Sequence, residues 1–174
     1  MKEIVVIGAG KVGSTVARLL APTGDYRVTL ADLSPEILDR FGRDERIRVG
    51  RDERIRAVTV DVVDSSELVT LLNGTYAVVN AAPFHLTTQI AEAAKAAGTH
   101  YLDLTEDVAS TRRVRAMASD AGTALVPQCG LAPGFVSIVA YDMAKRYEVL
   151  DTIDRKSTRL NSSHEIPSRM PSSA

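Results

Sequence analysis

The sequence predicts an α/β fold in which helices cover both faces of a doubly wound parallel sheet. Short apolar, β-branched runs alternate along the chain with segments whose apolar residues recur at helical spacing. This alternation is typical of right-handed βαβ units and hence of a parallel sheet. The chain has 174 residues, 45% of them apolar, which is enough for one buried core.

Each predicted strand is a short apolar run bounded by turn-forming residues. The predicted strands are Glu3–Ile7, Arg27–Ala31, Ala57–Asp61, Tyr76–Asn80, His100–Leu104 and Ala124–Gln128. Six strands in this order favour the doubly wound arrangement.

The predicted helices follow these strands and carry recognisable start and stop signals. Ser34 is expected to cap a short helix that has Pro35 at its first position, and Ser65 to cap a helix that ends before Asn73-Gly74. The other predicted helices are Lys11–Leu20, His85–Ala97, Val108–Ala121 and Phe135–Tyr147.

The composition excludes several classes of protein. A net charge of −1 gives no electrostatic case for binding nucleic acid, and no apolar run approaches the ~18 residues of a membrane span. The single cysteine, Cys129, excludes an internal disulfide framework, and neither His85 nor His100 has metal-ligand spacing. We therefore expect a cytoplasmic protein with no metal, no membrane contact and no nucleic-acid partner.

The first turn carries the motif with the clearest chemistry. Gly8-Ala9-Gly10-Lys11-Val12-Gly13 is a G-x-G-x-x-G sequence that leaves the first predicted strand and opens the first predicted helix. In this context the first Gly permits a tight turn, the second admits a pyrophosphate to the backbone, and the third allows helix and strand to pack closely. The pattern predicts a Rossmann-like dinucleotide-binding domain.

Other candidate cofactor residues follow the predicted strands at the same edge of the sheet. Asp32 lies 19 residues after Gly13, the spacing of a carboxylate that hydrogen-bonds the adenosine ribose. Asp61 is expected on the adenine side, and Asn80-Ala81-Ala82-Pro83 near the middle of the cofactor. A carboxylate at Asp32 repels a 2′-phosphate and so favours NAD, although Arg40 and the arginines after it leave NADP open.

Four segments together resemble the saccharopine dehydrogenase family, in particular its lysine 6-dehydrogenase-like members. They are GAGKVG at 8–13, NAAP at 80–83, HYLDLTED at 100–107 and CGLAPGF at 129–135, so the resemblance covers about residues 1–147. It implies an NAD(P)-dependent oxidoreductase that acts on a carbon bearing an amino group of a small amino-acid substrate. In that family the chain continues into a separate substrate domain, and the full-length enzyme can form a homodimer.

The resemblance also implies roles for individual residues. It places the cofactor on Gly8, Gly10, Lys11, Val12, Gly13, Asp32, Asp61, Asn80, Ala81, Ala82 and Pro83. Phe84, Tyr101, Asp103 and Glu106 would face the cleft. Proton transfer would fall to Asp103, alone or with Tyr101. Cys129 has no basic neighbour in sequence, so we interpret it as a small buried residue and not as a nucleophile.

Two other functions remain open from the sequence. Tyr141 and Lys145 form the Y-x-x-x-K pair of short-chain dehydrogenases, although the glycine spacing differs from that family's and Gln128 and Cys129 stand where its serine belongs. A non-catalytic NAD(H)-sensing module would need only the cofactor residues. The helix after CGLAPGF favours the oxidoreductase, because a sensor needs no entry into a substrate domain.

Two segments depart from the pattern of the rest. Residues 154–174 are rich in Ser and contain Pro167 and Pro171, and DRKSTRLNSSH at 154–164 resembles a translated sequencing adapter. We expect a domain over 1–153, truncated before the substrate domain and inactive by itself, with an incomplete sheet and a non-native or disordered tail over 154–174. A flexible basic tail is the alternative. The tandem repeat GRDERIR, within 42–57, is interpreted as a duplicated surface loop.

Overall fold

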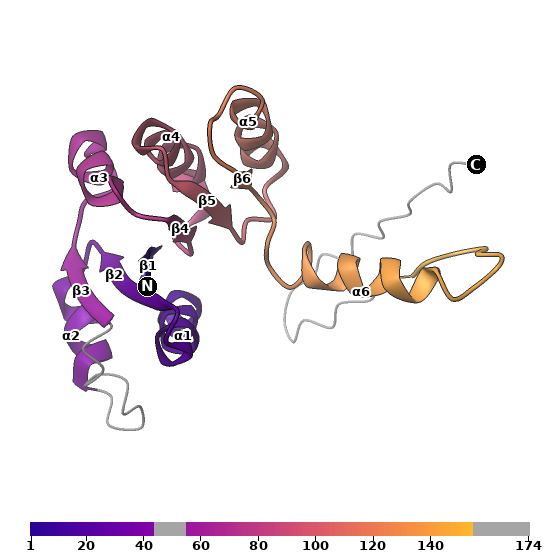
Figure 1. Cartoon of the computed structure of the whole chain (residues 1–174), viewed down its shortest axis with the longest axis horizontal. Coiled ribbons are helices and arrows are strands. Elements are labelled where there is room, and N and C mark those ends of the chain that lie inside the picture. Colours follow the sequence, from indigo (N-terminus) through magenta and orange to yellow (C-terminus); the bar gives the residue numbers. More distant parts are fainter. Residues whose placement is uncertain (44–54, 155–174) are drawn as a thin grey trace.

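The computed structural model describes residues 1–43 and 55–154 of the chain (Figure 1). Six parallel strands form one sheet in the order β3-β2-β1-β4-β5-β6, which is the doubly wound arrangement that the sequence predicts. The strands are β1 Lys2–Ile7, β2 Tyr26–Asp32, β3 Ile55–Thr59, β4 Ala77–Asn80, β5 His100–Asp103 and β6 Leu125–Val126. The α-helices are α1 Lys11–Leu20, α2 Pro35–Arg43, α3 Ser65–Leu72, α4 Thr87–Ala97, α5 Val108–Ala118 and α6 Phe135–Ala144.

The central strand β1 is buried on both faces, as expected of a parallel sheet between two helical layers. Ile4 and Val6 point to the face that α1 and α2 cover, whereas Val5 and Ile7 point to the opposite face. Because side chains alternate along a strand, a continuous apolar run supplies both cores at once. Figure 1 shows α1 and α2 on one side of the sheet and α3, α4 and α5 on the other.

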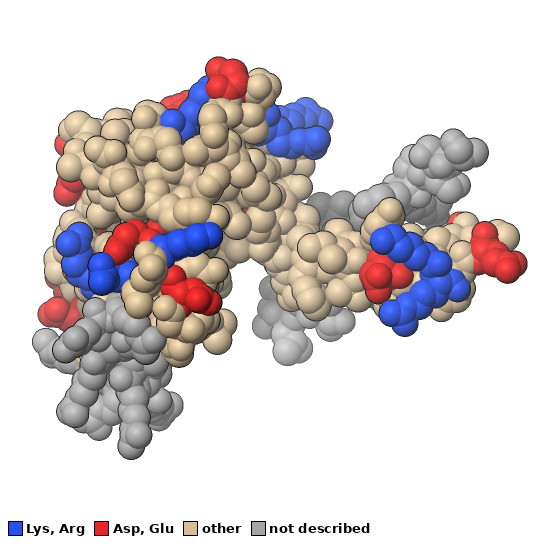
Figure 2. Space-filling view, viewed as in Figure 1, with Lys and Arg blue, Asp and Glu red and all other residues tan. Residues whose placement is uncertain are grey.

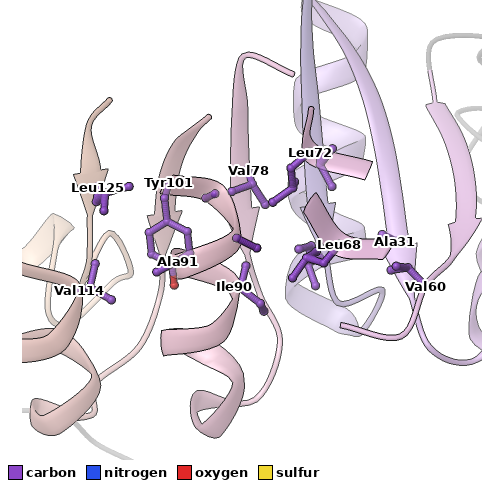
Figure 3. Packing of buried hydrophobic residues seen from close by; sticks show 14 residues of the cluster. Ala31, Val60, Leu68, Leu72, Val78, Ile90, Ala91, Tyr101, Val114 and Leu125 are labelled. Carbon is purple, nitrogen blue, oxygen red and sulfur yellow. The ribbon is translucent and has the colours of Figure 1, made fainter. Parts of the chain in front are cut away.

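The larger core lies beneath α3, α4 and α5 (Figure 3). Leu68 and Leu72 from α3, Ile90 from α4 and Val114 from α5 pack on the strands and are fully buried. Tyr101 of β5 belongs to the same core and its ring is shielded from solvent. This packing attaches the second half of the sheet to the first, and the residues that follow β4 lie against the glycine turn.

Several element bounds differ from the predicted ones for local reasons. The cap of α3 is Asp64 and not Ser65, because the Asp64 carboxylate accepts hydrogen bonds from the backbone N–H groups of Ser66 and Glu67. β3 ends at Thr59, two residues before Asp61, and the predicted helix 85–97 is preceded by a 3₁₀ turn, Phe84–Leu86. Ser34 is a cap as predicted, since its hydroxyl accepts a hydrogen bond from the N–H of Ile37.

Helix α6 extends away from the sheet (Figure 1) and buries none of its residues. Its exposed side chains include Phe135, Ile138 and Tyr141, with exposed fractions of 61%, 70% and 68%. In the described ranges no helix is long and apolar enough to cross a membrane. On the face in Figure 2, basic and acidic side chains lie close to one another in small groups.

Two predictions concern residues that the structure does not describe. The proposed tail falls outside the described residues except for Asp154, and most of the duplicated loop, residues 44–54, does as well.

Replacement of Leu68 by Ala tests the core beneath α3. Leu68 has no exposed surface, so the variant loses apolar contacts and leaves a cavity, and the free energy of unfolding should fall by about 2–5 kcal/mol. Leu19→Ala, at a residue that is 69% exposed, is the matched control and should change the free energy of unfolding by less than about 0.5 kcal/mol. Urea denaturation followed by circular dichroism measures both, and equal effects would contradict the packing described above.

Candidate functional site

The turn between β1 and α1 depends on glycine at two positions for steric reasons. Gly8 has a φ of +95°, and a Cβ there would lie 2.8 Å from the carbonyl oxygen of Ala81. A Cβ on Gly13 would overlap the carbonyl oxygen of Gly8. The first and third glycines therefore allow the turn to pack against α1 and against the residues that follow β4.

Gly10 differs from the other two glycines of the motif because its surroundings are open. A Cβ built there meets no atom within 4 Å, and Gly10 caps α1 without any side-chain hydrogen bond. The first N–H groups of a helix have no acceptor within the helix, and α1 has no acidic residue in its first turn. This open helix terminus fits an anion such as a pyrophosphate, which the N–H groups and the helix dipole would stabilise.

Asp32 joins the end of β2 to this turn. Its Oδ2 accepts a hydrogen bond of 2.7 Å from the N–H of Ala9, and its Oδ1 accepts one of 3.0 Å from the N–H of Ser34. The side chain is half-buried and lies beside the second residue of the glycine motif. Asp32 thus both supports the turn and presents a carboxylate at the edge where a dinucleotide would bind.

A cavity of about 520 Å³ opens beside the turn, at the carboxyl ends of β4 and β5. In an open parallel sheet, ligands bind in the crevice where the strand order reverses, which is here between β1 and β4. The cavity is lined by Val12, Asn80, Ala81, Ala82, Phe84, Thr87, Asp103, Leu104, Thr105, Glu106 and Asp107. Three of these described lining residues are acidic and none is basic.

The acidic residues of the cavity wall have different environments. Asp103 is almost completely buried, whereas Glu106 is exposed. Asp107 caps α5, and its hydrogen bonds from the backbone and side chain of Ser110 hold the pKa of its carboxyl below the usual range. At neutral pH Asp107 is therefore ionised and contributes negative charge to the wall.

A chain of buried hydrogen bonds runs beneath the cavity floor. Asn80 Oδ1 accepts from the N–H of Ala82 at 3.0 Å, and Asn80 Nδ2 donates to Tyr101 Oη at 3.1 Å. Tyr101 Oη in turn donates to Asp103 Oδ2 at 3.0 Å. Burial is the main cause that raises the pKa of the Tyr101 phenol, and the neighbouring Asp103 charge adds to it. The phenol is therefore un-ionised at neutral pH.

Asp103 also connects β5 to the segment after β6. Its Oδ1 accepts hydrogen bonds from the N–H groups of Thr105 and Gln128, and its carbonyl oxygen accepts one of 2.7 Å from the N–H of Cys129. Gln128 has a φ of +64°, a conformation that non-glycine residues seldom adopt. Cys129 is exposed, so the expectation that it is a buried residue is wrong. Partial desolvation and the Asp103 charge nevertheless raise the pKa of its thiol, which disfavours the reactive thiolate.

The structure brings together only some of the residues that the sequence singles out. Val12, Asn80, Ala81, Ala82, Phe84, Asp103 and Glu106 line the cavity. Gly8, Gly10, Lys11 and Gly13 lie in the adjoining turn, and Asp32 is bonded to it.

Other predicted residues lie elsewhere. The expectation that Tyr101 faces the cleft is wrong, because its position within β5 directs the ring into the core and its exposed fraction is 0%. Pro83 is outside the cavity lining, and Asp61 is exposed and accepts from the N–H of Val63. Tyr141 lies on α6 and Lys145 caps the C-terminus of that helix, with its ammonium over the Tyr141 ring, but neither residue is part of the cavity wall.

Four lining residues were not predicted from the sequence: Thr87, Leu104, Thr105 and Asp107. Leu104, Thr105 and Asp107 belong to the HYLDLTED segment and directly follow β5, so their place at the carboxyl end of a parallel strand was a usable signal. Thr87 had no such signal, because its position depends on the 3₁₀ turn that precedes α4.

Comparison with known proteins identifies the family. Residues 4–126 match the model of the saccharopine dehydrogenase NADP binding domain. The chain belongs to this family. It therefore carries an NAD(P)-binding domain of the saccharopine dehydrogenase type, as the resemblance of its four motifs predicts.

Solved structures agree on the fold. The apo saccharopine dehydrogenase (L-Glu forming) from Saccharomyces cerevisiae has a TM-score of 0.71 and 20% identity over 84% of this chain, which spans 31% of that enzyme's length. A UDP-glucuronic acid 4-epimerase from Bacillus cereus in complex with NAD has a TM-score of 0.56 and 16% identity, and the match covers 72% of this chain and 54% of the epimerase. A Rossmann-fold NAD(P)-binding family protein from Shigella flexneri has a TM-score of 0.53 and 14% identity, and the match covers 85% of this chain and 89% of that protein.

Replacement of Gly13 by Ala tests the close packing of the saccharopine dehydrogenase-type glycine turn. The added methyl would meet the Gly8 carbonyl, so the backbone must shift, and the free energy of unfolding should fall by about 1–3 kcal/mol. Gly122→Ala, where the methyl meets no atom within 4 Å, should leave stability unchanged or slightly raised. Thermal and urea unfolding compare the two, and full stability of Gly13→Ala would refute the close approach.

Proposed function

We propose that this chain is the cofactor-binding part of an oxidoreductase that transfers a hydride between NAD(P) and the amino-bearing carbon of an amino-acid substrate. The observation that carries the proposal is the open N-terminus of α1 at Gly10, which adjoins the acidic cavity. The nicotinamide ring supplies the hydride chemistry when it is bound. The protein's own residues would orient that ring, shield it and accept the proton that the substrate amine loses.

The proposal gives each part of the site a role in binding. The N–H groups of Lys11, Val12 and Gly13 would hold the pyrophosphate, with Gly8 and Gly10 leaving room for it. Asp32 would bind the adenosine ribose, with Asp61 on the adenine side. Asn80, Ala81, Ala82 and Pro83 would lie along the nicotinamide half, where Ala81 already packs against Gly8.

We favour NAD over NADP for this site. The Asp32 carboxylate lies 2.7 Å from the N–H of Ala9, at the end of β2 where a ribose 2′-substituent would be placed. A 2′-phosphate there would be repelled by the carboxylate, whereas a 2′-hydroxyl can donate a hydrogen bond to it.

The charge of the cavity supports an amino-bearing substrate. Asp103, Glu106 and Asp107 form an acidic wall that favours an ammonium group and disfavours a carboxylate in the same place. A carboxylate has about four acceptor positions, and the hydrogen bonds of Asp103 occupy three of them. The remaining position on Oδ2 would take the proton that the amine loses. Asp103 is thus the proposed catalytic residue, since Tyr101 does not reach the cavity.

Replacement of Gly10 by Val tests the pyrophosphate site. A Cβ at this position meets no protein atom within 4 Å, so the fold should persist while NADH affinity falls at least about tenfold, or about 1.4 kcal/mol. Gly122→Val, also in open space, is the matched control and should retain wild-type affinity. Fluorescence titration with NADH measures both. Unchanged affinity of Gly10→Val would remove the pyrophosphate assignment.

Replacement of Asp32 by Asn tests the preference for NAD. The wild-type protein should bind NADH more tightly than NADPH, and the variant should narrow the ratio of the two dissociation constants. The difference in binding free energy between NADH and NADPH should shrink by about 1 kcal/mol, the size of the interaction between unit charges about 4 Å apart in water. Asp25→Asn, exposed at the opposite edge of the sheet, should leave the ratio unchanged. An unchanged ratio of the NADH and NADPH dissociation constants in Asp32→Asn would contradict the assignment.

A further inference from the structure

The buried hydrogen bonds beneath the cavity form a path with a defined direction. Asn80 Oδ1 accepts from the N–H of Ala82, which leaves Nδ2 as the donor that faces Tyr101 Oη. Tyr101 Oη must then donate onward, and Asp103 Oδ2 is its acceptor at 3.0 Å. The carbonyl oxygen of Thr87 lies farther away, at 3.4 Å.

This path joins the ends of three neighbouring strands. Asn80 ends β4 and holds the N–H of Ala82 in the 80–83 turn, whereas Tyr101 and Asp103 belong to β5. Asp103 then accepts from the N–H of Gln128, just after β6. The Tyr101 hydroxyl is the central atom of the path, because it contacts both the amide of Asn80 and the carboxylate of Asp103.

Each polar group in the path is shielded from water. The exposed fractions of Asn80, Tyr101 and Asp103 are 3%, 0% and 1%. A buried polar group that loses its partner cannot turn to solvent for another, so it moves or the surrounding backbone moves. The turn at 80–83 has little freedom on its other side, because Ala81 packs against Gly8 and its N–H donates to the carbonyl of Ile7.

We propose that Tyr101 is a positioning residue, whose buried hydroxyl sets the 80–83 turn and the Asp103 carboxylate in a common geometry for the nicotinamide half of the cofactor. The proposal rests on the proposed function, since it assumes that a dinucleotide lies along this turn. It assigns to Tyr101 an indirect role through Asn80 and Asp103, in place of the direct proton transfer that the family resemblance implies.

The consequence is a difference between the two halves of the cofactor. The glycine turn and Asp32 would hold the pyrophosphate and the adenosine ribose, and neither is among the hydrogen-bond partners of the Tyr101 hydroxyl. Loss of the hydroxyl should therefore weaken a ligand that includes the nicotinamide and leave one that lacks it unaffected. A merely structural role would weaken both ligands together.

Tyr101→Phe, titrated with NADH and with ADP-ribose, tests the proposal. NADH affinity should fall about tenfold, the effect of unpairing a buried polar group, while ADP-ribose affinity stays within about twofold. The fluorescence emission of bound NADH should also shift towards that of free NADH. Tyr141→Phe, at an exposed hydroxyl on α6, is the matched control and should change neither affinity. Equal loss for both ligands, or no loss for NADH, would overturn the proposal.

A second pair of variants keeps the test decisive if Tyr101→Phe does not fold. In Asp103→Asn the new amide can donate to Tyr101 Oη, whose own proton then turns to the carbonyl of Thr87. The path is thus kept in Asp103→Asn and lost in Asp103→Ala. The ratio of NADH affinity to ADP-ribose affinity should be closer to the wild-type ratio in Asp103→Asn than in Asp103→Ala. An equal fall of this ratio in the two variants would overturn the proposal.

The same titrations separate this inference from the proposed function. A wild-type protein that binds neither NADH nor ADP-ribose would refute the cofactor site itself. Binding of both ligands by the wild type, with an unchanged ratio in Tyr101→Phe, would refute only the positioning role of Tyr101.

Discussion

The close approach of the glycine turn to the residues after β4 is the constraint on which the rest of the site depends. Gly8 can lie against the Ala81 carbonyl, and α1 can begin against Gly8, because neither Gly8 nor Gly13 carries a side chain. Asp32 holds the same turn from the side of β2 through the N–H of Ala9. The turn is thus supported from both neighbouring strands, and the N-terminus of α1 stays open towards the crevice.

The two cores place this turn and the acidic cavity at one edge of the sheet. Alternation along β1 sends Ile4 and Val6 to one core and Val5 and Ile7 to the other, so helices pack on both faces. With every strand parallel, the carboxyl ends of β1, β2, β4, β5 and β6 meet at the same edge. Chemistry-bearing residues that are far apart in sequence therefore share one crevice.

Much of the fold could be predicted because its signals are local and periodic. The bounds of α1 were predicted in full, and the alternation of elements predicted the parallel sheet. Errors occurred where two neighbouring residues compete for one role. Asp64 and Ser65 are both good caps, and only the hydrogen bonds to Ser66 and Glu67 show that Asp64 is used. The burial of Tyr101 was not predicted, because Tyr101 and Asp103 share one face of β5 and differ only in their place along the strand. Asp103 ends β5 at the cavity, whereas Tyr101 lies within the strand and in the core.

The sequence by itself determined the doubly wound fold, the glycine turn and the carboxylate at the end of β2. Each of these depends on residue type and spacing within one βαβ unit, where chain geometry leaves few alternatives. Only the tertiary structure decided that Asp103 lines the cavity while Tyr101 is buried below it, and that Asn80, Tyr101 and Asp103 share one path of hydrogen bonds. That outcome depends on how β4, β5 and β6 align side by side, and contacts between separate strands are set by packing and not by any single segment.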